Sequence, residues 1–150
     1  MIREATLDDI PAIMEMGRSM AQESPRFARL EWSERKVAKL LRTMILAPAA
    51  LVLVADEGGA FFLGIATEHW MSTDKVAADY AIYVSPERRG SALASAMIDR
   101  YKAWAIEQGA KVITLGISTG VHPERTAVLF ERKGFTRCAV TFEVENVHGS

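Results

Sequence analysis

The spacing of apolar residues along the chain changes between a helical period and a strand period. Three stretches carry an apolar residue every three or four positions, as on one face of a helix; they are 10–20, 37–45 and 93–101. A fourth, shorter helix is predicted from Pro123 to Gly134, because proline is tolerated in a first turn and glycine commonly follows a last one. The pattern therefore predicts about four helices.

Runs of β-branched and aromatic residues between these helices predict strands. Leu51 to Asp56 is almost wholly apolar, as in a buried strand, and the turn Glu57-Gly58-Gly59 leads into a return strand. Other strands are predicted at 1–5, 60–71, 76–84, 111–118 and 140–147, with the final strands starting at Phe135. We therefore expect a sheet of about six to seven strands.

The order of these elements predicts a mixed sheet. The three strands between 51 and 84 are joined by short turns, so they should form an antiparallel meander, with a bulge at Gly64. The unit from Val76 to Ser118 reads strand, helix, strand, and such a crossover implies parallel pairing. The expected fold class is α/β (α+β), in a single domain that spans residues 1–150.

Composition narrows the class of protein. The 150 residues carry a net charge of −1 and no basic block, which disfavours a nucleic-acid partner. No apolar run reaches the length of a membrane span, and no signal peptide is visible, so we expect a cytoplasmic protein without a membrane partner. Cys138 is the only cysteine, so neither an intrachain disulfide nor a cysteine-based metal cluster is possible. We expect no metal, and a packed Cys138.

The stretch from Tyr80 to Ile98 reads as a strand, a tight basic turn and a helix. A helix start with glycine and arginine offers free backbone N–H groups and the positive end of a dipole, which suits phosphate. No P-loop signature is present. The alternative is an ordinary connection in which Arg88 and Arg89 are a solvated surface pair.

Two motifs resemble those of the GNAT N-acetyltransferase family. Arg89-Gly90-Ser91-Ala92-Leu93-Ala94 is similar to its acyl-CoA pyrophosphate loop, Arg/Gln-x-x-Gly-x-Gly/Ala, and follows a Val-x-Pro-Glu sequence as in the family. Ala92 stands where the family usually has its central glycine. The alanine side chain is small, but it makes a close approach to the backbone harder than glycine does. The segment from Glu124 to Phe135 resembles the family's Ala-x-x-Leu-Tyr-Glu-Lys-x-Gly-Phe helix. The resemblance covers essentially the whole chain.

The resemblance implies a GNAT fold and direct transfer of an acyl group from a cosubstrate, acetyl-CoA, to a primary amine of a small molecule or protein. The cosubstrate would lie against the strand before the loop, against the loop itself and against the last helix; these residues are Ile82, Tyr83, Val84, Arg89, Gly90, Ser91, Ala92, Leu93, Ala94 and Phe130. Phe130 replaces a tyrosine that protonates the leaving thiolate in many members. Tyr83 or Tyr101 could substitute, and Phe130 could instead pack along the pantetheine.

An acceptor amine must lose a proton before it attacks, so a base is needed. Asp79, Glu68 and His69 are the candidates, because their strand ends flank the expected cleft. An Asp in the middle of a strand is unfavourable unless it has a function, and this favours a role for Asp79. The plain alternative is an exposed or edge-facing Asp79 without a catalytic role. By analogy with the family's inter-helix loop, acceptor contacts are expected from three residues, Glu23, Phe27 and Trp32; a solvated loop is the alternative.

Two other readings stay open. The same fold can serve as a non-catalytic acyl-CoA-binding or interaction module, and both Ala92 and Phe130 lean that way. An unrelated α/β domain would need both motifs to be coincidence. A homodimer paired through the predicted strand Val140 to Val147 is a further hypothesis.

Overall fold

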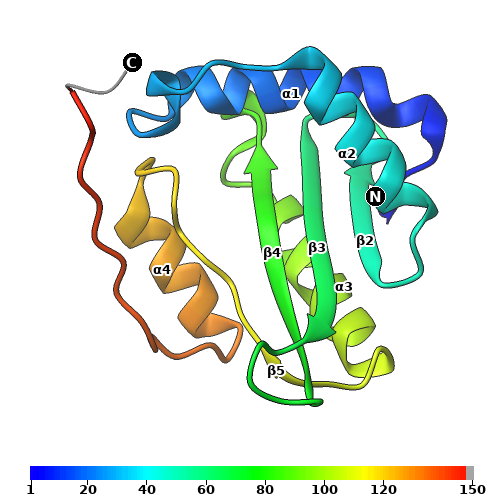
Figure 1. Cartoon of the computed structure of the whole chain (residues 1–150). Coiled ribbons are helices and arrows are strands. Elements are labelled where there is room, and N and C mark those ends of the chain that lie inside the picture. The colour runs from blue at the N-terminus through cyan, green and yellow to red at the C-terminus, as the bar shows by residue number, and fades with distance from the viewer. Residues whose placement is uncertain (148–150) are drawn as a thin grey trace.

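The computed structural model describes residues 1–147 and shows a five-stranded sheet with helices on both faces (Figure 1). The strands lie side by side in chain order: β1 (Ile2–Glu4), β2 (Ala50–Ala55), β3 (Ala60–Glu68), β4 (Lys75–Val84) and β5 (Ala110–Ile113). The helices are α1 (Ile10–Glu23), α2 (Glu34–Leu46), α3 (Leu93–Glu107) and α4 (Pro123–Arg132). Short 3-10 turns lie at Leu7–Asp9 (η1), Phe27–Arg29 (η2) and Pro86–Arg88 (η3). The mixed class and the four helices are confirmed.

The first four strands pair antiparallel and β5 joins β4 in parallel, as the chain order predicts. The β4–β5 ladder is short, because its last registered pair is Ala77 with Ile113. The predicted extension of this strand to Ser118 is therefore wrong. Beyond Ala77 the edge of β4 that faces β5 has no strand beside it within the described residues.

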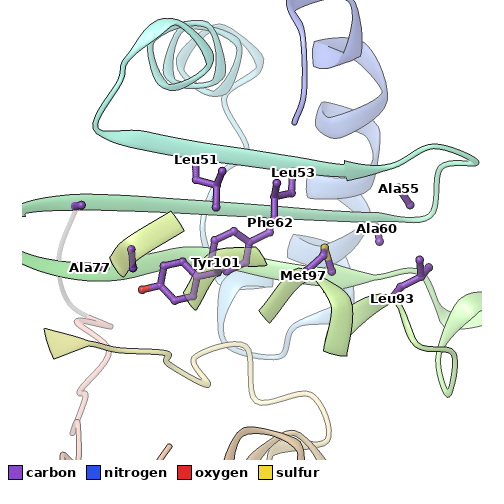
Figure 2. Close-up of a cluster of buried hydrophobic side chains, with 11 residues drawn as sticks. Leu51, Leu53, Ala55, Ala60, Phe62, Ala77, Leu93, Met97 and Tyr101 are labelled. Atoms are coloured by element: carbon purple, nitrogen blue, oxygen red, sulfur yellow. The ribbon is translucent and has the colours of Figure 1, made fainter. Parts of the chain in front are cut away.

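Two apolar cores hold the sheet between its helices. On one face, Ile13 and Met14 of α1 and Leu41 and Met44 of α2 pack on Phe61 and its neighbours. On the other face, α3 packs on β2, β3 and β4, and Figure 2 shows this cluster. At its centre the rings of Phe62 and Tyr101 lie 4.7 Å apart. These cores make β4 a rigid support for whatever lies on its open edge.

The predicted bulge at Gly64 is present, but the extra residue belongs to the opposite strand. Leu63 pairs with Ala81 and Gly64 pairs with Asp79, so Tyr80 has no partner in β3. Gly64 itself is required by packing, since a Cβ there would lie 2.8 Å from Cε1 of Phe62. The bulge twists β4 at the point where β5 leaves it.

The predicted strand Val140 to Val147 is wrong. Residues 136–146 form no helix or ladder, and every residue from 136 to 147 is exposed, including Cys138, which we expected to be packed. The reason is that β5 ends early and offers no neighbouring edge to this segment. The sheet therefore has five strands where six to seven were predicted. None of the described helices is long and apolar enough to cross a membrane.

Candidate active site

The separation of β4 from the chain after β5 leaves a cavity of about 530 Å³. One wall is β4 from Asp79 to Val84, and the other runs from Gly116 through α4 to Arg132. The end of α1 and η2 close the cavity with Met20, Glu23 and Phe27. The loop at Arg89 to Ser91 borders it where α3 begins. Segments distant in sequence thus converge on the unpaired edge of one strand.

Asp79 spans the gap where the two walls begin to separate. Its Oδ1 accepts a hydrogen bond of 3.0 Å from the backbone N–H of Gly116. Burial raises the pKa of Asp79 from 3.8 to about 6, although the Gly116 hydrogen bond opposes this. A carboxyl group with such a pKa is mostly ionised at neutral pH and can still accept a proton, as a general base must.

The loop after β4 presents the amino-terminal end of α3 to the cavity. Gly90 has φ +85°, a left-handed conformation that favours glycine. Ala92, the helix cap, has φ −82°, which any residue adopts. The alanine at the family's central glycine therefore causes no backbone strain here. The first N–H groups of an α-helix lack intrahelical partners, so this end suits a phosphate group.

Arg89 is held by two groups rather than standing free. Its Nε donates to the Val84 carbonyl at 2.9 Å, and its two Nη atoms donate to both carboxylate oxygens of Glu23 at 2.5 and 2.6 Å. The hydrogen bonds from Arg89 lower the pKa of Glu23, against the opposing effect of burial. The guanidinium would have to leave Glu23 before it could bind a phosphate with those donors.

Side-chain bonds fasten α1 and η2 to the loop on the far wall. Ser24, fully buried, donates to the Thr119 carbonyl at 2.5 Å, and Arg26 donates to the Ser118 carbonyl. The segment 24–29 therefore forms a roof that bridges both walls. Phe27 lies in this roof and lines the cavity.

The α4 wall is anchored to α3 at one end. Lys102 donates to the Lys133 carbonyl at 2.7 Å, and the Lys133 ammonium lies 2.9 Å from the Asp99 carboxylate. Phe130 is buried with 6% of its surface exposed, and it lines the cavity. It contacts the Phe135 ring, with 6.3 Å between centroids. An apolar ring at this place offers a surface for an aliphatic chain but no proton.

The two tyrosines considered as replacement acids lie in different environments. Tyr83 lines the cavity, and burial followed by the nearby charge of Glu23 raises its pKa. Tyr101 is fully buried in the α3 core, and its hydroxyl donates to the Thr114 carbonyl at 2.7 Å. Burial raises the pKa of Tyr101 as well. Only Tyr83 of the two can meet a ligand in the cavity.

The structure brings most of the predicted site residues together. These are Asp79, Ile82, Tyr83, Val84, Arg89, Gly90, Ser91, Ala94, Phe130, Glu23 and Phe27, which all line the cavity. Ala92 caps α3 beside it, while the Leu93 side chain is buried in the core.

Glu68, His69 and Trp32 lie elsewhere. Glu68 pairs with Lys75 at the far end of the β3–β4 ladder. Gly64, the partner of Asp79, lies four residues before Glu68, so Glu68 is about 13 Å along the strand from the level of Asp79. His69 follows it and accepts a hydrogen bond from the Met71 N–H at 3.3 Å. Trp32 packs over Gly17, and its Nε1 donates to Glu34 at 2.7 Å. None of these three side chains lines the cavity.

Three kinds of cavity residue were not found from the sequence. Tyr80 is 53% exposed and lines the cavity because it is the extra residue of the bulge. His122 precedes α4 in a left-handed conformation with φ 44°, which is uncommon for a residue other than glycine. Arg125 and Arg132 come from the cavity side of α4. A helical-wheel projection of α4 could have identified these arginines from the sequence.

Within residues 1–147 no group of three or more His, Cys, Asp or Glu side chains is arranged to hold a metal ion. The cavity itself presents a carboxyl group of raised pKa, the unpaired edge of β4, a helix start and several arginines.

Comparison with solved structures finds the same fold in several acetyltransferases. An aminoglycoside antibiotic 6′-N-acetyltransferase from Acinetobacter haemolyticus is 17% identical, with a TM-score of 0.72 over 98% of this chain and 99% of that chain. A ribosomal-protein-alanine N-acetyltransferase from Brucella melitensis is 19% identical, with a TM-score of 0.69 over 97% of each chain. An acetyltransferase from Trypanosoma brucei gives a TM-score of 0.73 at 16% identity, over 97% of this chain and 98% of that chain.

The two sequence comparisons give different results. No match is found among curated proteins. Residues 16–135, well over half of the chain, match the family described as the acetyltransferase (GNAT) family. The two motifs, the cavity along the unpaired edge of β4 and this match lead to one conclusion: the chain belongs to the GNAT acetyltransferase family.

Proposed function

We propose that this protein transfers an acetyl group from acetyl-CoA directly to a primary amine, in a complex that holds both substrates at once. The observation that carries the proposal is the unpaired edge of β4, which shares one cavity with Asp79 and the start of α3. Such an edge exposes a row of backbone N–H and C=O groups that an extended ligand can pair with. The two amides of a pantetheine arm match this requirement.

The residues around the loop fit the phosphate end of acetyl-CoA. Gly90 keeps the backbone open, and the amides from Ser91 to Ala94 lie at the start of α3. Arg125 and Arg132 add positive charge to the cavity, whereas the guanidinium of Arg88 is paired with Glu57 at 3.1 Å. Anionic groups bind well to helix starts and to guanidinium groups, so this end is assigned to the pyrophosphate and the neighbouring phosphate.

The pantetheine would follow β4 from Val84 back toward Ile82, with Phe130 as an apolar wall on the other side. A strand N–H near Ile82 would polarise the thioester carbonyl, because donors aimed at a developing negative oxygen stabilise the transition state. In this arrangement the reacting carbon would lie near Ile82, three residues along β4 from Asp79.

Asp79 is the base in this proposal. It accepts the first proton that the protonated amine must lose, and the amine nitrogen then forms a bond to the thioester carbon while the carbon–sulfur bond breaks. The nitrogen gives up a second proton as the amide forms, and one proton in turn converts the departing thiolate to the CoA thiol. The departing thiolate has a pKa near that of cysteine, about 8.5, so it leaves without a strong acid. Tyr83 is the cavity residue that can return a proton to it.

One observation favours a second function, an acyl-CoA-binding module without catalysis. Phe130 stands where many family members place their acid, and it cannot donate a proton. The other feature that favoured this alternative is weaker, since Ala92 adopts an unstrained backbone.

Calorimetric titration with acetyl-CoA, desulfo-CoA and ATP tests the binding half of the proposal. We expect tight binding of the two CoA compounds and little binding of ATP. Thiol release is then followed with a panel of primary amines. Binding without amine-dependent thiol release would support the non-catalytic module, and absence of CoA binding would contradict both functions.

A further inference from the structure

The ladder between β4 and β5 ends at a defined point. Its last registered pair is Ala77 with Ile113, and the Thr114 N–H donates to the Ala77 carbonyl at 2.9 Å. Continued in the same register, a parallel ladder would next join the Asp79 N–H to the Thr114 carbonyl and the Gly116 N–H to the Asp79 carbonyl. Neither of these two bonds is present among the described residues. Two side chains occupy the same backbone groups instead.

The hydroxyl of Tyr101 takes the first of these groups. It donates to the Thr114 carbonyl at 2.7 Å, and the Thr114 hydroxyl donates to the Ala77 carbonyl at 3.2 Å, so Thr114 is held from both sides. Polar groups withdrawn from water need a partner, and the Thr114 carbonyl could find one in the Asp79 N–H. The Tyr101 hydroxyl is therefore not required to satisfy this carbonyl; it replaces a ladder bond.

The Asp79 carboxylate takes the remaining groups. Its Oδ1 accepts the Gly116 N–H at 3.0 Å, in place of the backbone carbonyl of the same aspartate. The backbone N–H of Asp79 also bonds its own carboxylate, and both bonds oppose the rise in the pKa of Asp79 that burial causes. The two walls therefore separate where one side chain from α3 and one from β4 replace the ladder.

The Tyr101 ring is fixed in place by the core behind β4. Figure 2 shows it in the apolar cluster next to Phe62, with 4.7 Å between the ring centroids. Gly64, the β3 partner of Asp79, leaves room for this ring, since a Cβ at Gly64 would lie 3.3 Å from Cε1 of Tyr101. Side chains packed this closely hold their rotamers, so the hydroxyl keeps one direction.

We propose that Tyr101 is a positioning residue for Asp79. Its hydroxyl keeps the Thr114 carbonyl out of the ladder, and the Gly116 N–H is thereby left to bind the carboxylate. Without the hydroxyl, the Thr114 carbonyl would pair with the Asp79 N–H, and the Gly116 N–H would move to the Asp79 carbonyl. The cleft would then begin one residue pair later, and the carboxyl group would lose a bond that favours its ionised form. This inference rests on the proposed function, in which Asp79 is the base.

Tyr101 acts only through Asp79 and the chain from 114 to 116. Its side chain is fully buried in the α3 core and does not line the cavity, so it touches neither proposed substrate. Burial, followed by the nearby charge of Asp79, raises the pKa of Tyr101. The hydroxyl therefore remains a donor to the Thr114 carbonyl throughout the pH range in which Asp79 titrates.

NMR of the whole protein, with carbon-13 in the aspartate carboxyl groups, tests the proposal without acetyl-CoA or an amine. In the wild type the Asp79 carboxyl signal should titrate with a midpoint of about 6, and the Gly116 amide proton should shift with it. In Tyr101→Phe the midpoint should rise by about 0.5–1 pH unit and the amide response should disappear, because the bond from Gly116 lowers the pKa of Asp79.

Ile98→Val is the matched control. Ile98 is fully buried on α3 but lies outside the apolar cluster of Figure 2, so loss of one methyl group should lower the urea midpoint without changing the Asp79 titration. The proposal would be overturned by a Tyr101→Phe variant whose Asp79 midpoint and Gly116 response match the wild type. A wild-type Gly116 amide that does not follow the Asp79 titration would overturn it as well, and this measurement needs no variant.

Thiol release with an accepted amine separates this inference from the proposed function. In Tyr101→Phe the acid limb of kcat should move to higher pH by the same amount as the Asp79 midpoint, whereas a merely structural role of Tyr101 would lower stability without moving this limb. The expected NMR changes in a protein that transfers no acetyl group would refute the proposed function alone. Transfer with an unmoved acid limb and an unmoved Asp79 midpoint would refute the positioning role alone.

Discussion

The two walls of the cavity are held by different forces. The β4 wall lies between two apolar cores and pairs with β3 from Lys75 to Val84, except at the bulged residue Tyr80. The α4 wall, from Gly116 to Arg132, has only Ala127 and Phe130 buried in its helix. Its attachments are mostly hydrogen bonds, such as the one that the Gly116 N–H donates to Asp79 and the one that Lys102 donates to the Lys133 carbonyl.

Because of this difference, the β4 wall is rigid and the α4 wall can move. A wall enclosed by close-packed side chains cannot shift without repacking, so in the proposed reaction β4 would fix the position of the reacting groups. A wall held by a few exchangeable hydrogen bonds opens at lower cost, because each contributes only about 0.5–1.5 kcal/mol. Movement at the cavity is therefore expected at the α4 wall, while β4 stays in place.

The largest expected effect comes from removing the base on the rigid wall. Asp79→Asn keeps an acceptor for the Gly116 N–H but cannot take a proton, so turnover should fall by about 10²–10⁴-fold. In the wild type, kcat should rise with pH through about 6, because the ionised form is the base. Stopped-flow or plate-based thiol release with an accepted amine measures both.

Asp74→Asn is the matched control for this variant. Asp74 lies in the turn before the opposite end of β4 and pairs only with exposed Lys111. Its turnover and pH profile should be those of the wild type. If Asp79→Asn retains its rate across the whole pH range, Asp79 is not the base.

The same substitution should stabilise the fold. Burial raises the pKa of Asp79 from 3.8 to about 6, so above pH 6 the folded protein holds a carboxylate that is more stable in water. This cost is absent below the unfolded pKa and grows as pH rises from 3.8 through about 6, reaching at most about 3 kcal/mol. Urea unfolding of Asp79→Asn should therefore show a gain at pH 8 that disappears near pH 3. A gain of equal size at both pH values would mean that charge is not its cause.

A pair of glycine substitutions compares the two walls directly. Gly64→Ala would place a Cβ 2.8 Å from Phe62 and 3.3 Å from Tyr101, within the core behind β4. Overpacking of this kind should lower the free energy of unfolding by about 1–3 kcal/mol. The Cβ added by Gly116→Ala would have Oδ1 of Asp79 as its nearest neighbour, at 3.9 Å, so this variant should change stability little. Chemical denaturation of both variants checks this, and equal losses would contradict the division between a rigid and an adaptable wall.

The sequence predicted the rigid part of the molecule better than the adaptable part. Periodicity found three helices, and Pro123 and Gly134 marked the fourth. Short turns and element order predicted the meander and the crossover, because these are local patterns supported by the same cores. Alternation alone also predicted a strand at 140–147, and there it was wrong. Alternation favours an extended chain, but a strand requires a neighbouring edge, and β5 supplies none after Ile113.

The site shows the same limit. Motif residues on β4 and its loop reached the cavity as expected, whereas Glu68 and His69 were chosen by nearness to a strand end. Strand ends face opposite directions in a meander, and only register decides which end meets the cleft. Tyr80 was missed because a one-residue bulge changes the face on which a side chain lies.

The smallest expected effect concerns the contact between the rigid wall's loop and α1. Glu23 occupies both Nη atoms of Arg89 next to the proposed pyrophosphate site, and its carboxylate is ionised because Arg89 lowers its pKa. Replacing it by glutamine removes a negative charge that competes with phosphate for the same guanidinium. We expect Glu23→Gln to bind acetyl-CoA several-fold more tightly at low salt, with a smaller difference at high salt, where screening weakens the repulsion. Glu15→Gln, on the same helix but outside the α4-lined cavity, is the control for helix charge. Weaker binding by Glu23→Gln, measured by calorimetry at both salt concentrations, would instead mean that the carboxylate holds Arg89 in its binding position, and that this pair belongs to the rigid wall.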